Sequence, residues 1–207
     1  MLIKWIVCDV PEYKKVKFSY AQEQWKSLSS VDGFLGQIGG WDLNIPSKAG
    51  IISFWRDQLS YQFFMEHKHD EIFKENEQKN TYERISVEIF NKKLNISDYE
   101  ITQFLRKAEI LRIANCIVKE DKKDHFETMQ KDVWNEGMSK YQEMLAGVFC
   151  ENNQNKYLVV SLWGSKDSHQ KYVKNTLPSL VEKSKVKDDL VQIQGTVLKL
   201  DRNWSVI

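Results

Sequence analysis

The sequence predicts an α+β fold, built from two tandem ferredoxin-like βαββαβ units that pack sheet to sheet within one chain. The first observation is a repeat: Ser53-Phe54-Trp55 returns 108 positions later as Ser161-Leu162-Trp163, and Cys8 returns as Cys116. A repeat of this period indicates one fold used twice. The second observation is the element order, because each half reads strand, helix, strand, strand, helix, strand, which is the split βαβ arrangement.

The first half begins with a buried strand, because residues 2–8 are apolar except for Lys4, as in a strand covered on both faces. The helix that follows Pro11 carries apolar residues spaced by three, four and three positions. They are Phe18, Ala21, Trp25 and Leu28. Further strands are expected at 34–41, 49–55 and 82–90, and a helical region at 57–77 that is broken around 67–70.

The second half repeats this order. Strands are expected at 111–118, 145–151, 156–163 and 191–200, with helices at 125–140, 166–174 and 180–185, the last two separated by Pro178. Residues 91–108 form a packed connector in which Ser97 is the expected cap of a short helix with Ile101, Phe104 and Leu105. The predicted domains are 1–95 and 109–207, joined by the connector at 96–108.

Composition excludes several classes of protein. The chain has 30 basic and 29 acidic side chains, so its net charge of +1 creates no field that attracts nucleic acid or anionic lipid. No apolar stretch approaches the roughly 20 residues that cross a bilayer, and no signal-peptide pattern is present. Three scattered cysteines without CxxC spacing favour a reducing compartment. We therefore expect a cytoplasmic protein with no nucleic-acid or membrane partner.

Several motifs carry a family resemblance. Gly33-Phe34-Leu35-Gly36, the Ser53-Phe54-Trp55 strand and the segment with His67 and His69 resemble the dimeric α+β barrel superfamily, whose best-known branch comprises the antibiotic-biosynthesis monooxygenases and includes haem-degrading enzymes. GFLGQIGGW, HDEIF and ILRIANC are more closely similar to the uncharacterised bacterial YdbC-like family, over essentially the whole chain. The resemblance implies an intrachain dimeric α+β barrel made by duplication, without an established reaction.

The haem-degrading branch uses an asparagine on the first strand, a tryptophan on the second helix and a histidine about ten residues later. The corresponding positions hold Val7, Phe64 and Lys74 in the first half, and Asn115, Tyr172 and Glu182 in the second. Neither half has the set, so no cofactor is predicted, and haem remains an option with an incomplete motif. The broader monooxygenase branch implies no metal, because in some members the substrate itself carries electrons to oxygen.

Two residues are candidates for catalysis. His69 suits a pocket acid, base or ligand, because histidine commonly performs that work near neutral pH. The alternative is a solvated helix end, and His67 and His69 do not share a helix face, so no metal site is predicted. Asn115 alternates with buried Leu111 and Ile113 on one strand face, where its amide needs hydrogen-bond partners. Those partners belong to a ligand, or else to the backbone or water.

Six aromatic residues are candidates for the wall of an apolar cavity. The tryptophans come as matched pairs in the two halves, for which core packing is the alternative. The six are Trp25, Trp55, Phe64, Trp134, Trp163 and Tyr172.

Three functional hypotheses follow. The first is a cofactor-independent, monooxygenase-like enzyme that oxidises a small aromatic or polycyclic ligand between sheet and helices. The second is a binding or sensing module for a small molecule or haem, without chemistry. The third is a barrel that acts through association with another protein. The sequence leaves open whether the protein is an enzyme, which half holds the working pocket, and whether it is a monomer with an internal pseudo-dimer or a homodimer.

Overall fold

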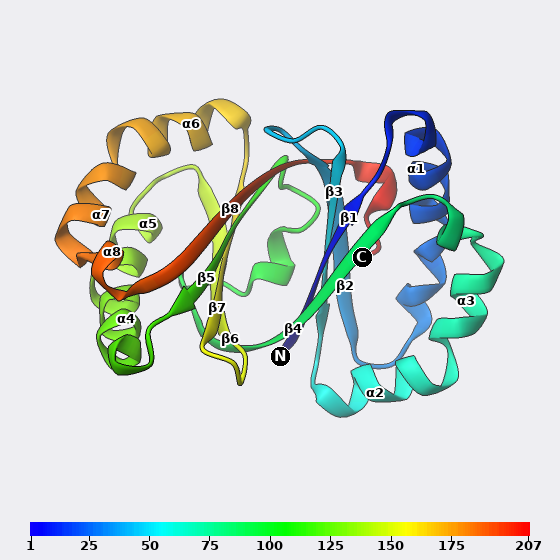
Figure 1. Cartoon of the computed structure of the whole chain (residues 1–207), viewed down its shortest axis with the longest axis horizontal. Coiled ribbons are helices and arrows are strands. Elements are labelled where there is room, and N and C mark those ends of the chain that lie inside the picture. The colour runs from blue at the N-terminus through cyan, green and yellow to red at the C-terminus, as the bar shows by residue number, and fades with distance from the viewer. The chain divides into compact units, whose positions relative to one another are not determined.

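The computed structural model describes the whole chain, residues 1–207 (Figure 1). It contains two compact units. The first comprises Met1–Ile89 together with Leu198–Ile207, and the second comprises Phe90–Val197. The domain boundaries at 95 and 109 remain a prediction.

The first unit contains an antiparallel sheet in the order β4-β1-β3-β2-β8. The strands are β1 (Leu2–Asp9), β2 (Phe34–Asp42), β3 (Lys48–Trp55), the first part of β4 (Arg84–Asn95) and the end of β8 (Leu190–Leu200). In the register, Leu2 lies opposite Trp55 and Gly40 lies opposite Leu200. Gly40 allows the close approach of β8, because a Cβ there would lie 2.0 Å from the carbonyl oxygen of Lys199.

The helices of the first unit begin with a 3-10 turn at Glu12–Lys14, followed by α1 (Lys15–Glu23) and a 3-10 helix at Gln24–Ser30. The predicted stripe of Phe18, Ala21, Trp25 and Leu28 is buried, which confirms the helical spacing. α2 (Gln58–His67) and α3 (His69–Glu75) are separated at Lys68, as the sequence predicts. Asp57 begins α2 by accepting a hydrogen bond from the Ser60 amide at 2.8 Å.

The second unit repeats this architecture in the strand order β8-β5-β7-β6-β4. Its remaining strands are β5 (Ile110–Val118), β6 (Met144–Glu151) and β7 (Lys156–Trp163). Its helices are α4 (Lys123–Met129), α5 (Glu136–Ser139), α6 (Lys166–Asn175), α7 (Leu177–Ser184) and α8 (Val186–Asp189). Ile110 lies opposite Trp163, just as Leu2 lies opposite Trp55. The predicted α+β fold with two ferredoxin-like units is therefore confirmed.

Three local predictions are wrong. Residues 125–140 do not form one regular helix, because a π-helical segment at Gln130–Asn135 separates α4 from α5. Ser97 caps no helix: its hydroxyl is buried without a hydrogen-bond partner, and the 3-10 helix at Ile101–Phe104 begins after Glu100. Residues 91–95 belong to β4 rather than to a connector.

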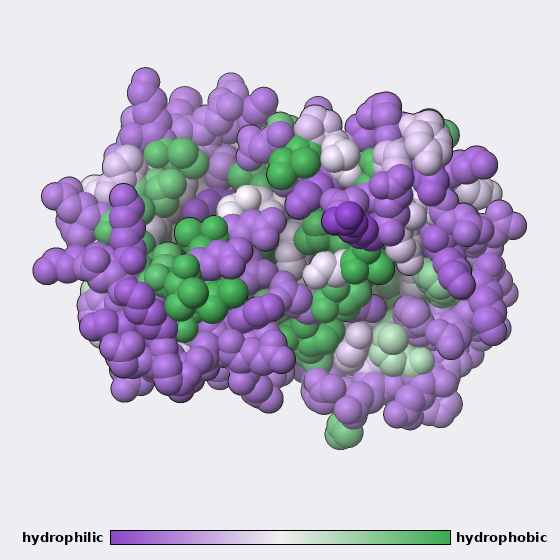
Figure 2. Space-filling view, in the orientation of Figure 1, coloured by the Kyte–Doolittle hydropathy of each residue, from purple (hydrophilic) through white to green (hydrophobic).

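Each unit leaves apolar side chains exposed on a long strand. Ile85 and Val87 are exposed on β4, and Val191 and Ile193 on β8. Figure 2 shows an apolar patch over this part of β8. No helix is long and apolar enough to cross a membrane.

Candidate functional site

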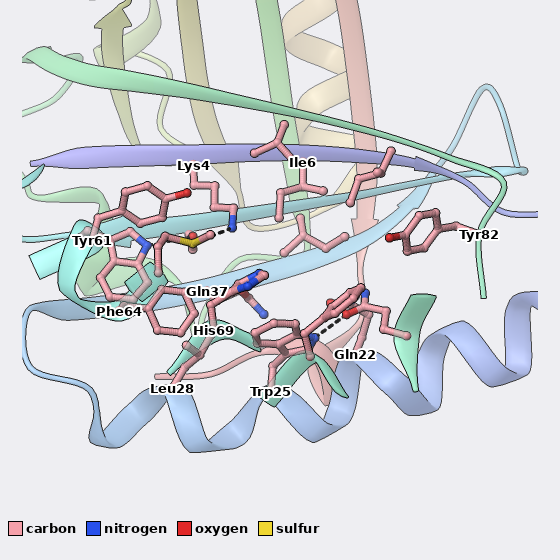
Figure 3. A pocket seen from close by; sticks show the side chains of 18 residues that line it. Lys4, Ile6, Gln22, Trp25, Leu28, Gln37, Tyr61, Phe64, His69 and Tyr82 are labelled. Carbon is pink, nitrogen blue, oxygen red and sulfur yellow. Dashed lines mark hydrogen bonds between the residues drawn. The ribbon is translucent and has the colours of Figure 1, made fainter. Parts of the chain in front are cut away.

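The first unit contains a cavity of about 380 Å³. In Figure 3 it lies between the sheet, from which Lys4 descends, and the helical segment that carries Trp25 and Leu28. α2 and α3 contribute Phe64 and His69, and Ile85 and Val87 of β4 also line it. A space of this size, with mostly apolar walls and a few polar groups, is typical of a small-molecule site.

The aromatic walls of the cavity are held in place by packing and hydrogen bonds. Trp55 stacks on Phe64 with ring centroids 4.8 Å apart, and its Nε1 donates to the Ser53 hydroxyl at 3.2 Å. Trp25 Nε1 donates to Gln78 Oε1 at 2.7 Å in a buried bond. The indole N–H groups are satisfied, so these side chains contribute apolar surface to the walls of the cavity.

His69 is placed on the cavity by the break between α2 and α3. Its ring stacks on Phe73 with centroids 5.8 Å apart, and Nδ1 lies 2.9 Å from Asp70 Oδ1. This hydrogen bond holds the pKa of Asp70 below its ordinary value. An ionised carboxylate only accepts, so Nδ1 carries the proton, and in the neutral ring Nε2 keeps its lone pair. His69 therefore has the tautomer of a general base.

Lys4 supplies a cation that the sequence analysis missed as a site residue. It is 8% exposed, and no carboxylate lies within salt-bridge distance of its ammonium group. The ammonium group contacts Met65 Sδ at 4.0 Å and the Tyr61 ring, whose centroid lies 5.5 Å from Nζ. Burial lowers the pKa of Lys4 to about 8. The available sequence signal was a lone lysine within an apolar strand.

Gln37 is the second polar residue that the sequence analysis missed. It lies on β2, is 5% exposed and lines the cavity, and its Nε2 has no hydrogen-bond partner. A buried amide donor without an acceptor is uncommon in folded proteins. Gln37 therefore gives the cavity an unused donor, and the signal for it was a polar side chain in a glycine-rich strand.

The predicted site residues fall into two groups. Trp25, Trp55, Phe64 and His69 line the cavity of the first unit. Asn115, Trp134, Trp163 and Tyr172 belong to the second unit. Trp163 and Tyr172 are fully buried with ring centroids 4.8 Å apart, whereas Asn115 and Trp134 are half-buried. The structure thus brings four of the eight predicted residues together around one cavity.

The second unit carries a different set of groups at the matching positions. His169 stands where the first half has Tyr61, and its Nε2 is buried without a partner. Burial, together with Arg112, lowers the pKa of His169 to about 4. The Tyr141 ring packs against both Trp163 and Tyr172, with centroids 5.7 Å from each. The two units have therefore diverged in the chemistry of equivalent positions.

Comparison with solved structures supports the fold. A proposed monooxygenase from Fusobacterium nucleatum matches 96% of this chain and 91% of its own length, with a TM-score of 0.77 and 14% identity. An anthrone oxidase-like protein matches 97% of this chain and 91% of its own length, with a TM-score of 0.71 and 10% identity. At such low identity these similarities show a shared fold.

Comparison of sequences identifies the family. A family described as "Domain of unknown function (DUF4937)" matches residues 2–90. The "Uncharacterized protein YdbC" of Bacillus subtilis (strain 168) is 42% identical over 92 residues, which are 44% of this chain and 77% of that protein. The chain belongs to the YdbC family.

Proposed function

We propose that the cavity of the first unit binds a small aromatic or polycyclic molecule and oxidises it with dioxygen. The observation that carries the proposal is the presence of His69, oriented by Asp70, within a cavity of about 380 Å³ whose walls include Trp25 and Trp55. This combination offers a planar binding site with one positioned base. The fold shared with a proposed monooxygenase and an anthrone oxidase-like protein supports the same reaction class by analogy.

The chemistry begins with proton transfer. Nε2 of His69 removes a proton from a CH₂ group that is acidified by adjacent aromatic rings and a carbonyl. The electron pair left on the ligand reduces dioxygen. One oxygen atom remains in the product as a carbonyl and the other leaves as water, so that R₂CH₂ and O₂ give R₂C=O and H₂O. The ligand supplies all the electrons, and the step needs no external reductant.

The residues around the cavity do not fit a haem. Of the three positions that the haem-degrading branch uses in the first half, only Phe64 lines the cavity, whereas Val7 and Lys74 do not. His69 is the imidazole that lines the space, but it follows Phe64 by five residues rather than by about ten, so it does not occupy the ligand position of that branch. The ammonium of Lys4 and the amide N–H of Gln37, which also line the space, are hydrogen-bond donors and not iron ligands. The proposed reaction therefore has no step that uses haem.

The cytoplasmic location expected from the sequence remains a prediction.

The proposal is tested by oxygen uptake with a panel of anthracenones and hydroxylated naphthalenes. We expect uptake with the purified protein, and a rate lower by on the order of 10²–10⁴-fold in His69→Ala. His67→Ala is the matched control, because His67 is exposed, does not line the cavity and contacts the Phe63 carbonyl at 2.9 Å.

Three other results distinguish the alternatives. Binding of the panel without oxygen uptake would identify a non-catalytic binding module. Equal loss of activity in the two histidine variants would remove His69 as the base. Neither binding nor uptake would overturn the proposal as a whole.

A further inference from the structure

We propose that the ligand of this cavity carries an anionic oxygen, and that Lys4 and Gln37 bind this oxygen together. The inference rests on the proposed function, since it assumes that the cavity of the first unit holds an aromatic ligand. It adds the chemical class of that ligand, which is an aromatic carboxylate or the phenolate or enolate of a hydroxylated ring system.

The first step of the argument is the unmet charge of Lys4. An ammonium group has three N–H donors and no acceptor, and burial without a counter-ion is costly. The Met65 sulfur at 4.0 Å is a weak acceptor, and the Tyr61 ring face provides only a cation–π contact. Because its pKa remains about 8, most Lys4 side chains are charged at pH 7. The cavity therefore contains a cation whose partner must come from outside the chain.

The second step is the position of Gln37 relative to Lys4. In the sheet register, Lys4 on β1 lies opposite Ser53 on β3, and Ser53 lies opposite Gln37 on β2. Residues in such a row across neighbouring strands point to the same face. Strands are spaced by about 4.8 Å, so the backbones of Lys4 and Gln37 are about 10 Å apart, a gap that two long side chains can close around one group. Figure 3 shows both side chains reaching into the same space.

The third step is the kind of atom that this pair requires. Lys4 Nζ and Gln37 Nε2 are both donors, and neither has an acceptor oxygen within the protein. An ionised oxygen accepts several hydrogen bonds and pairs with the charge, whereas a neutral apolar ligand would leave both donors buried and unsatisfied. The aromatic walls beside them accommodate the rings that carry this oxygen.

The second unit shows that the donor pair is specific to the first. The row equivalent to Lys4, Ser53 and Gln37 consists of Arg112, Ser161 and Gly147. The amide is therefore replaced by a residue without a side chain. Arg112 keeps the positive charge in the second unit and lies outside the cavity, so it offers a matched control.

The test measures binding of two pairs of ligands by calorimetry at pH 7. Naphthalene-2-carboxylate is compared with naphthalene-2-carboxamide, and 2-naphthol with 2-methoxynaphthalene, so that the pairs separate a carboxylate from a phenolic oxygen. We expect wild-type protein to bind the acidic member of at least one pair about tenfold or more tightly than its neutral analogue. Lys4→Met should abolish this preference, Gln37→Leu should reduce it several-fold, and Arg112→Met should leave it unchanged.

The outcomes separate this inference from the proposed function. Equal affinity of wild-type protein for both members of each pair would overturn the role of Lys4 and Gln37 while leaving the aromatic cavity intact. A preference that survives in Lys4→Met would overturn it equally. Failure of all four compounds to bind would overturn both the inference and the ligand-binding function. Should Lys4→Met not fold, the ligand pairs on the wild-type and Gln37→Leu proteins still decide the question.

Discussion

The amine of Lys4 makes ligand affinity depend on pH in a defined direction. Burial lowers its pKa to about 8 in the free protein, and a bound anion would raise it again. The complex then holds more protons than the free protein above pH 8, so affinity falls as pH rises through that value, by up to about tenfold per pH unit. We expect constant affinity for naphthalene-2-carboxylate between about pH 7 and 7.5 and a decline above pH 8, measured by calorimetry.

The control for this pH dependence is the neutral carboxamide, whose affinity should stay level. Tyr61 does not confound the measurement, because burial raises its pKa and keeps the phenol neutral. A flat profile to pH 9.5 for the carboxylate, or the same decline in Lys4→Met, would show that another group titrates.

At the scale of residues, the sequence predicts the aromatic residues of the cavity and His69, and it misses Lys4 and Gln37. Trp25 and Trp55 stand out as bulky groups at repeated positions. Lys4 does not, because a single lysine in an apolar strand is equally compatible with a side chain that extends to solvent. Only the register that aligns Lys4 with Gln37 through Ser53 shows that the two donors share a face.

At the scale of elements, matched caps begin equivalent helices in the two units. Asp57 begins α2, and Ser165, 108 residues later, begins α6 by accepting from the Ser168 amide at 3.1 Å. Ser165→Ala removes this acceptor, so we expect the free energy of unfolding to fall by about 1 kcal/mol. Ser165→Asp, which copies the first unit, should retain most of the stability. Urea denaturation measures both variants, and equal destabilisation by Ala and Asp would show that the cap contributes nothing specific.

The sequence predicts the positions of the strands more accurately than it predicts the helix at 125–140. Strands are marked by apolar runs and by the repeat, whereas the π-helical segment at Gln130–Asn135 changes the helical period within the element. It buries Gln130, whose side-chain amide donates to Asn135 Oδ1 at 2.8 Å. The hydrogen bond to Asn135 satisfies the buried amide of Gln130. Regular helical spacing of apolar residues does not predict that this polar side chain is buried.

At the scale of the whole molecule, the two ends of the chain build one unit. Leu198–Ile207 belongs with Met1–Ile89, and no local pattern in the sequence indicates this association. The backbone N–H of Gln37 donates to the Val206 carbonyl at 2.8 Å, and the backbone N–H of Val206 donates to the Gln37 carbonyl at 3.0 Å. The C-terminal segment therefore supports the strand that carries one of the two donors of the cavity.

Trp204 anchors this C-terminal segment and gives the last prediction. It is fully buried, and its ring centroid lies 5.5 Å from that of Phe18 and 5.2 Å from that of Trp41. Trp204→Ala leaves a large cavity, so we expect the free energy of unfolding to fall by about 3–5 kcal/mol in urea denaturation, with weaker ligand binding because β2 loses its support. Tyr20→Ala, at a side chain that is 65% exposed, is the control and should change stability by less than about 0.5 kcal/mol. A Trp204→Ala protein with wild-type stability would show that the Trp204 ring does not anchor the C-terminal segment.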